Sequence, residues 1–114
     1  MRVAALVDDL LDRSRITAAL PDVAMCRDRA AVGEADVIVV DLARHAGDVA
    51  PLRAAWPGAR IVAYGAHVDD ATLAAARDDG ADVVLARSRF FHDPAAAVAP
   101  PTDAMAPSDG AGEG

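Results

Sequence analysis

Five short, continuous apolar runs constrain most strongly what this chain can form. They alternate with helix-like segments and occupy residues 3–7, 23–25, 37–40, 60–64 and 83–86. Most are rich in β-branched residues and show no alternation with polar residues, which is typical of strands covered on both faces of a parallel sheet. Strands that alternate with helices over short connections favour a doubly wound α/β fold.

The length of 114 residues is enough for one domain with a single core. We predict that residues 1–98 fold and that residues 99–114 form a disordered, acidic tail rich in Ala, Pro and Gly, because this stretch has little large apolar surface. For the folded part we expect a flavodoxin-like three-layer sandwich with a five-stranded parallel sheet in the order 2-1-3-4-5. Its second helix should be short because few residues connect the second strand to the third. Its last helix should be short because Pro100 and Pro101 end it.

Several helix boundaries have recognisable end signals. Asp69 is placed to cap a helix after the fourth strand, and Gly80 to close it in the left-handed conformation. Asp48 is expected to cap the third helix through its carboxylate. Asp93 followed by Pro94 predicts one more capped helix start.

Charge and composition exclude several classes of function. The formal net charge of −7 argues against binding nucleic acid through its phosphates, which requires a basic face. The single cysteine, Cys26, has no partner for an internal disulfide or a thiolate metal cluster. No apolar window approaches a membrane span, and Asp8 breaks the first apolar run before the core of a signal peptide forms. We therefore expect a cytoplasmic protein that binds neither nucleic acid nor membrane.

Acidic residues follow two of the predicted strands. Asp8 and Asp9 come after the first strand, and Asp41 comes directly after the third. In the expected strand order these two strands are neighbours, so their carboxyl ends share one edge of the sheet. Three carboxylates in one crevice repel one another, which raises the pKa of at least one unless a cation lies between them. Mg²⁺ prefers such oxygen ligands, so we assign Asp8, Asp9 and Asp41 as candidate metal ligands.

Other interpretations of these residues stay open. Aspartate is common at strand-to-helix turns, and Asp9 or Asp12 can simply cap the first helix. His67, after the fourth strand, would suit a Zn²⁺ or Mn²⁺ site with the carboxylates, although a loop histidine is more often solvated. The sequence contains no GxGxxG, no GxxxxGK[ST] and no nucleophile elbow. We therefore expect no dinucleotide site, no P-loop and no enzyme.

The acidic pair, the later aspartate and the stretch RIVAYGAHVDDATLAAARDDGADVVLARS together resemble a response-regulator receiver domain, over about residues 2–92. The resemblance implies that Asp8, Asp9 and Asp41 bind Mg²⁺ and that Asp41 accepts a phosphoryl group from a histidine kinase. It also places Arg87 at the position of the family's lysine. A carboxylate is a reasonable nucleophile when a metal neutralises the transferred group.

The chain departs from the receiver pattern at several positions. Gly65 stands where the family has Thr or Ser, so the hydroxyl that bonds the phosphoryl group is missing. Arg87 replaces lysine, and the planar guanidinium is not a conservative substitute at a tight site. Only 32 positions separate Asp9 from Asp41, fewer than in most receivers. Arg44 and His45 follow Asp41 and are placed to crowd or neutralise the acidic pocket.

These departures favour a degenerate, stand-alone pseudo-receiver that acts by protein–protein interaction without phosphorylation. The alternative is a Mg²⁺-dependent phosphoacceptor that a histidine kinase phosphorylates at Asp41, with Arg87 in place of the lysine. A third hypothesis is a small-molecule or transition-metal binder that uses His67. The expected partner is a signalling protein or a histidine kinase, and the fold also permits a homodimer.

Overall fold

The computed structural model describes residues 1–100. The predicted acidic tail lies almost entirely outside these described residues, so its disorder stays a prediction. Among residues 1–100, no helix combines the length and apolar character needed to cross a membrane.

The sheet has five parallel strands in the order β2-β1-β3-β4-β5, as predicted. Each strand lies within one residue of its predicted bounds. They are β1 (Val3–Leu6), β2 (Ala24–Cys26), β3 (Val37–Asp41), β4 (Arg60–Gly65) and β5 (Val83–Ala86). The central register pairs Leu6 with Val40 and Asp41 with Tyr64, so the ends of these strands form one edge.

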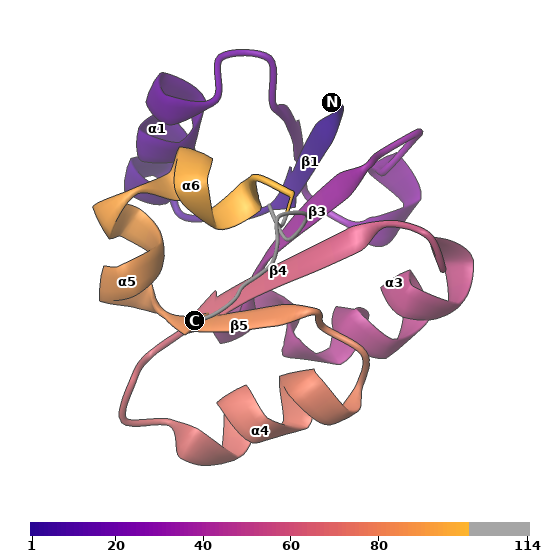
Figure 1. The fold of residues 1–114 in the computed structure, drawn as a ribbon, viewed down its shortest axis with the longest axis vertical. Helices are drawn as coiled ribbons and strands as arrows, with labels where there is room; N and C mark the ends of the chain where they lie inside the picture. The colour runs from indigo at the N-terminus through magenta and orange to yellow at the C-terminus, as the bar shows by residue number, and fades with distance from the viewer. Residues whose placement is uncertain (101–114) are drawn as a thin grey trace, which may run out of the picture.

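Helices cover both faces of the sheet and complete three layers (Figure 1). One layer contains α1 (Leu10–Ala19), α5 (Arg87–His92) and α6 (Pro94–Val98). The other contains α2 (Leu42–His45), α3 (Val49–Ala55) and α4 (Asp70–Asp78). Two short 3₁₀ helices, η1 (Arg29–Ala31) and η2 (Ala46–Asp48), complete the set. The predicted shortening is confirmed, because η1 alone connects β2 to β3 and the last helical region is divided into two short pieces.

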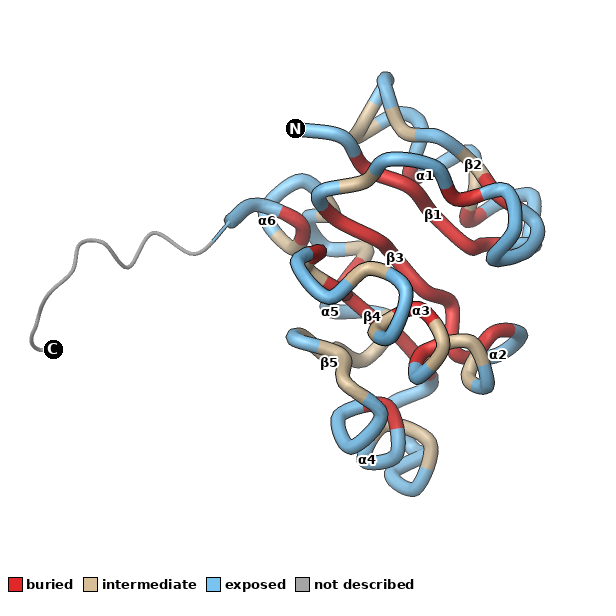
Figure 2. The backbone as a smooth tube through the Cα atoms, turned by 90° about the vertical axis from the view of Figure 1, so that its right-hand side faces the viewer, coloured by how far each residue is buried: buried red, intermediate tan, exposed pale blue. Residues whose placement is uncertain are grey.

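Two apolar clusters hold the layers together, one on each face of the sheet. Alternate residues of β3 contribute to each, with Ile38 on the side of α2 to α4 and Val39 on the side of α1, α5 and α6. Figure 2 shows the buried backbone running along β1 and β3 between more exposed helices. Burial on both faces explains why these strands are continuous apolar runs in the sequence.

Side-chain caps fix several of the predicted boundaries. Asp69 accepts a hydrogen bond from the backbone N–H of Thr72 at 3.2 Å, and Asp93 accepts one from Ala96 at 3.1 Å. Gly80 follows α4 with a φ of 115°, in the left-handed region as predicted. The expected cap by Asp48 is wrong, since its carboxylate makes no hydrogen bond to the backbone of α3.

Candidate functional site

The strand ends on the carboxyl edge of the sheet surround an acidic pocket. Asp8 and Asp9 lie in the connection after β1, and Asp41 is the last residue of β3. The pocket has a volume of about 280 Å³, and its lining residues are Asp8, Asp9, Asp12, Asp41, Ala43, Arg44 and Arg87. The structure thus brings the four residues assigned from the sequence, Asp8, Asp9, Asp41 and Arg87, around one pocket.

Asp41 is only 4% exposed, and its carboxylate caps the helix that follows. Its Oδ1 accepts a hydrogen bond from the backbone N–H of Ala43 at 3.0 Å, which closes the first turn of α2. Burial raises the pKa of Asp41, and the charge of Asp12 raises it further. The side chain predicted to be the phosphoacceptor therefore also has a local structural role.

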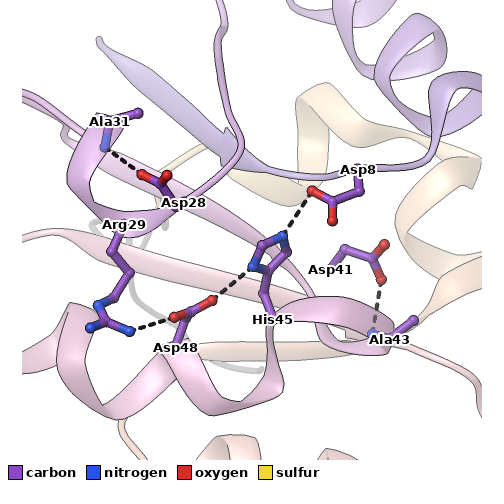
Figure 3. A network of polar contacts seen from close by, with 8 residues as sticks. All are labelled: Asp8, Asp28, Arg29, Ala31, Asp41, Ala43, His45 and Asp48. Atoms are coloured by element: carbon purple, nitrogen blue, oxygen red, sulfur yellow. Dashed lines mark hydrogen bonds and ion pairs between the residues drawn. The ribbon is translucent and has the colours of Figure 1, made fainter.

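His45 connects two carboxylates across the pocket's edge (Figure 3). Its Nε2 lies 3.1 Å from Oδ1 of Asp8, and its Nδ1 lies 2.7 Å from Oδ2 of Asp48. An ionised carboxylate only accepts hydrogen bonds, so these two partners favour the imidazolium form of His45, in which both ring nitrogens donate. Burial alone would lower the pKa of His45, but the hydrogen bonds and charges of Asp48 and Asp8 together raise it.

Asp48 supports this imidazolium instead of capping α3. Its Oδ1 accepts a hydrogen bond from Arg29 of η1 at 2.6 Å, while Oδ2 faces His45. Burial alone would raise the pKa of Asp48, but His45 and Arg29 lower it. The sequence-based prediction assigned the wrong partner because a short-range cap was the only interaction visible in the sequence.

Asp9 caps the first helix, which is one of the roles that the sequence left open for it. Its Oδ2 accepts a hydrogen bond from the backbone N–H of Asp12 at 3.0 Å and caps α1. This engages one carboxylate oxygen with a backbone donor of the first helical turn, where the helix dipole also favours a negative charge.

Asp12 is a pocket residue that the sequence indicated only as a possible cap. It is fully buried and receives a hydrogen bond from the Tyr64 hydroxyl at 3.0 Å. Both terminal nitrogens of Arg87 donate to its two carboxylate oxygens. Burial alone would raise the pKa of Asp12, but Arg87 and Tyr64 lower it. Asp12 lies four residues before the buried Ile16, so both residues are on the inner face of α1. This spacing was the only sign in the sequence that Asp12 is buried.

Arg87 is therefore committed to a partner inside the protein. The hydrogen bonds to Asp12 raise the pKa of its guanidinium above the ordinary value. The same guanidinium lies 4.9 Å from the ring centre of Phe91, a cation–π contact. The guanidinium thus lies between the carboxylate of Asp12 and the ring of Phe91.

Gly65 lies at the end of β4, and apolar side chains surround the position where it lacks a side chain. A Cβ placed there would lie 3.3 Å from Cβ of Leu42 and 3.3 Å from Cδ2 of Leu73. The space that a Ser or Thr would need is thus already tight.

His67 does not join the carboxylates. It is exposed in the connection between β4 and α4 and does not line the acidic pocket. The arrangement gives no support to a metal site that combines it with Asp8, Asp9 and Asp41.

As they lie, Asp8, Asp9 and Asp41 do not form a ready-made site for the Mg²⁺ that the resemblance implies. A hydrogen bond within the protein engages one oxygen of each carboxylate. Within residues 1–100, no three His, Cys, Asp or Glu side chains are grouped closely enough to hold a metal ion. A metal role for Asp8, Asp9 and Asp41 stays a prediction from the resemblance.

Several solved structures with this arrangement are response regulators. One from Burkholderia pseudomallei, with a phosphorylated aspartic acid, a calcium ion and citrate, gives a TM-score of 0.72 at 24% identity, covering 91% of this chain and 69% of that chain. The fold is that of a receiver domain. The phosphorylated cyanobacterial phytochrome response regulator RcpA gives a TM-score of 0.68 at 15% identity, covering 80% of this chain and 86% of its own.

A response regulator from Thermotoga maritima also shares the receiver fold, with a TM-score of 0.63 at 15% identity over 76% of this chain and 85% of that one. No family model matches the sequence, and no curated protein matches it. The likeness to receivers therefore lies in the arrangement of the backbone.

Proposed function

We propose that this protein is a receiver-like signalling module that acts by protein–protein interaction and does not require phosphorylation. The observation that carries the proposal is the state of Arg87, which is bonded through both terminal nitrogens to the buried Asp12. In receivers the basic residue at this position serves the phosphorylated aspartate. Here its charge is already compensated, and moving it would leave Asp12 buried without a cation.

Two further features support the proposal. Gly65 provides no hydroxyl beside Asp41, and Leu42 and Leu73 crowd its position. Leu10 and Leu11 are 77% and 57% exposed where α1 begins, and contacts with another protein commonly bury such side chains. The cytoplasmic location expected from the sequence belongs to the same proposal.

Phosphorylation of Asp41 provides the direct test. The protein is incubated with Mg²⁺ and acetyl phosphate and then measured by intact mass spectrometry, with Asp41→Asn as the matched control and a phosphorylatable receiver as the positive control. We expect no added phosphoryl group under conditions that label the positive control. Stoichiometric labelling that disappears in Asp41→Asn would establish the alternative, a Mg²⁺-dependent phosphoacceptor.

A further inference from the structure

We propose that the acidic segment of residues 101–114 binds back onto the outer face of α1 and α5 and forms ion pairs there with exposed arginines. The segment lies outside the described residues, and it contains Asp103, Asp109 and Glu113 but no basic residue. The contact goes beyond the proposed function. Only its consequence, that the segment competes with a protein partner for this face, rests on that function.

Charge is distributed unevenly over the layers of the fold. The stretches 10–19 and 87–98, which form α1, α5 and α6, contain four of the eleven arginines and only two of the eighteen acidic residues. One of these two, Asp12, is buried and paired with Arg87. All other described residues together contain seven arginines and thirteen acidic residues. An acidic segment is therefore attracted to this layer and repelled by the rest of the protein.

Two exposed arginines of this layer have no ion-pair partner within residues 1–100. They are Arg15 of α1 and Arg89 of α5. The guanidinium of Arg15 lies 5.7 Å from the ring centre of Phe91, so its charge lies over α5. Leu11 lies one turn before Arg15 on the same side of α1 and is 57% exposed. The face thus combines positive charge with apolar surface, which suits a segment whose acidic residues are separated by Ala, Met and Pro.

The position of α6 brings the segment to this face. α6 packs against both α1 and α5 and ends at Val98, two residues before the described part of the chain ends (Figure 1). From Pro100 to Asp109 a chain extends up to about 30 Å, roughly twice the length of a helix like α1. A tether of this length keeps the effective concentration in the millimolar range, so weak ion pairs suffice to populate the contact. Such exposed pairs add little to the free energy of unfolding.

Paramagnetic broadening in NMR tests the contact directly. A nitroxide is attached at Ser108→Cys in a protein whose buried Cys26 is replaced by alanine, and backbone amide intensities are compared between low salt and high salt. We expect the amides of α1 and α5 to lose at least half of their intensity at low salt, and those of α4 in the opposite layer to change little. High salt should reverse most of the loss, since screening weakens exposed ion pairs.

Charge variants separate ion pairing from the mere proximity of a tethered segment. Combining Arg15→Glu with Arg89→Glu should abolish the excess broadening on α1 and α5. Replacing the three acidic residues of the segment with their amides should have the same effect. Arg77→Glu is the matched control, because Arg77 is an exposed arginine on α4 in the other layer, and this change should leave the broadening as it is.

Three results would overturn the inference. One is equal broadening of both helical layers, and another is broadening of α1 and α5 that persists in the amide variant. The third comes from mixing isotope-labelled protein with spin-labelled protein that carries no isotope, where broadening would assign the occupant of the face to a second copy. No phosphodonor is present in these measurements, so the inference and the proposed function can fail separately.

Discussion

A carboxylate that loses all contact with water needs compensating donors, and Asp12 obtains them from Tyr64 and Arg87. Tyr64 is itself fully buried and stacks on Phe90 at a ring-centre distance of 4.7 Å. Apolar packing therefore borders the carboxylate of Asp12, whereas the Arg87 side chain is 43% exposed on the side of the acidic pocket.

Replacing Asp12 should therefore be costly. Asp12→Asn keeps the shape but leaves Arg87 without its counter-ion, and we expect the free energy of unfolding to fall by about 2–4 kcal/mol. Chemical denaturation measures the change. The control Asp22→Asn, at an exposed turn, should stay within about 0.5 kcal/mol of wild type. Equal stability of the two variants would show that the buried pair contributes nothing.

The imidazolium of His45 makes stability depend on pH. The pKa of His45 in the folded protein is raised above the ordinary 6.5, chiefly because Asp48 and Asp8 outweigh the effect of burial. Its stabilising contribution is therefore fully present below pH 6.5 and is lost as the pH rises through the folded-state pKa. The groups facing it are Asp8, Asp48 and, by charge, the nearby Asp41.

Denaturation of wild type and His45→Gln from pH 5.5 to pH 9, in buffer containing a chelator, measures this effect. The difference in unfolding free energy between the two proteins should shrink as the pH rises, since glutamine does not titrate. A difference that stays constant over this range would mean that folding does not shift the pKa of His45.

At the scale of elements, the crowded end of β4 shows why a missing hydroxyl cannot simply be restored. Gly65→Ser should destabilise the protein by about 1 kcal/mol, because its Cβ meets Leu42 and Leu73 at 3.3 Å. Gly65→Ala should lower the free energy of unfolding by a similar amount if crowding is the cause. Adding Leu73→Ala to Gly65→Ser should reduce the loss of unfolding free energy that the serine causes. A double-mutant cycle measures this coupling.

The turn after α4 depends on glycine for two separate reasons. Gly80 has a φ of 115°, and a Cβ there would lie 2.8 Å from Cγ of Arg53. Gly80→Ala should lower the unfolding free energy by about 2–3 kcal/mol through backbone strain and displacement of Arg53. Gly58→Ala is the matched control, since nothing lies within 4 Å of its added Cβ. Thermal unfolding of the pair distinguishes strain from a general effect of alanine.

The sequence predicts elements better than it predicts the partners of charged groups. Continuous apolar runs marked all five strands, and the pattern is clearest for β1, β3 and β4, which are buried along nearly their whole length. Caps such as Asp69 and Asp93 were also visible, since donor and acceptor lie three residues apart. Asp12 and Arg87 lie 75 positions apart, and no local pattern joins them.

At the scale of the whole molecule, the C-terminal helices close the face of the sheet that α1 leaves open. Val98 of α6 and Phe90 of α5 are fully buried in the same apolar cluster as Ile16. Phe90 therefore packs in the same layer as the short C-terminal helix. The end of the folded domain, predicted at residue 98, can then be tested by shortening the chain.

Two truncations define that boundary. A chain ending at Pro100 should keep the unfolding free energy of the full chain within about 0.5 kcal/mol, because the sequence after it has little apolar surface to bury. A chain ending at His92 loses α6 and the buried Val98, and should be less stable by about 2–3 kcal/mol. Equal stability of both truncations would place the boundary before α6.

The pairing of Asp12 with Arg87 also bears on how the protein is made. During synthesis the chain leaves the ribosome from its amino end, so this carboxylate emerges 75 positions ahead of the guanidinium that compensates it. Until translation has passed Arg87, burying the carboxylate of Asp12 is unfavourable. We therefore expect the first helix of the nascent chain not to pack on the sheet before then. The segment that contains Arg87, translated well after the first helix, is thus the one that permits this helix to dock.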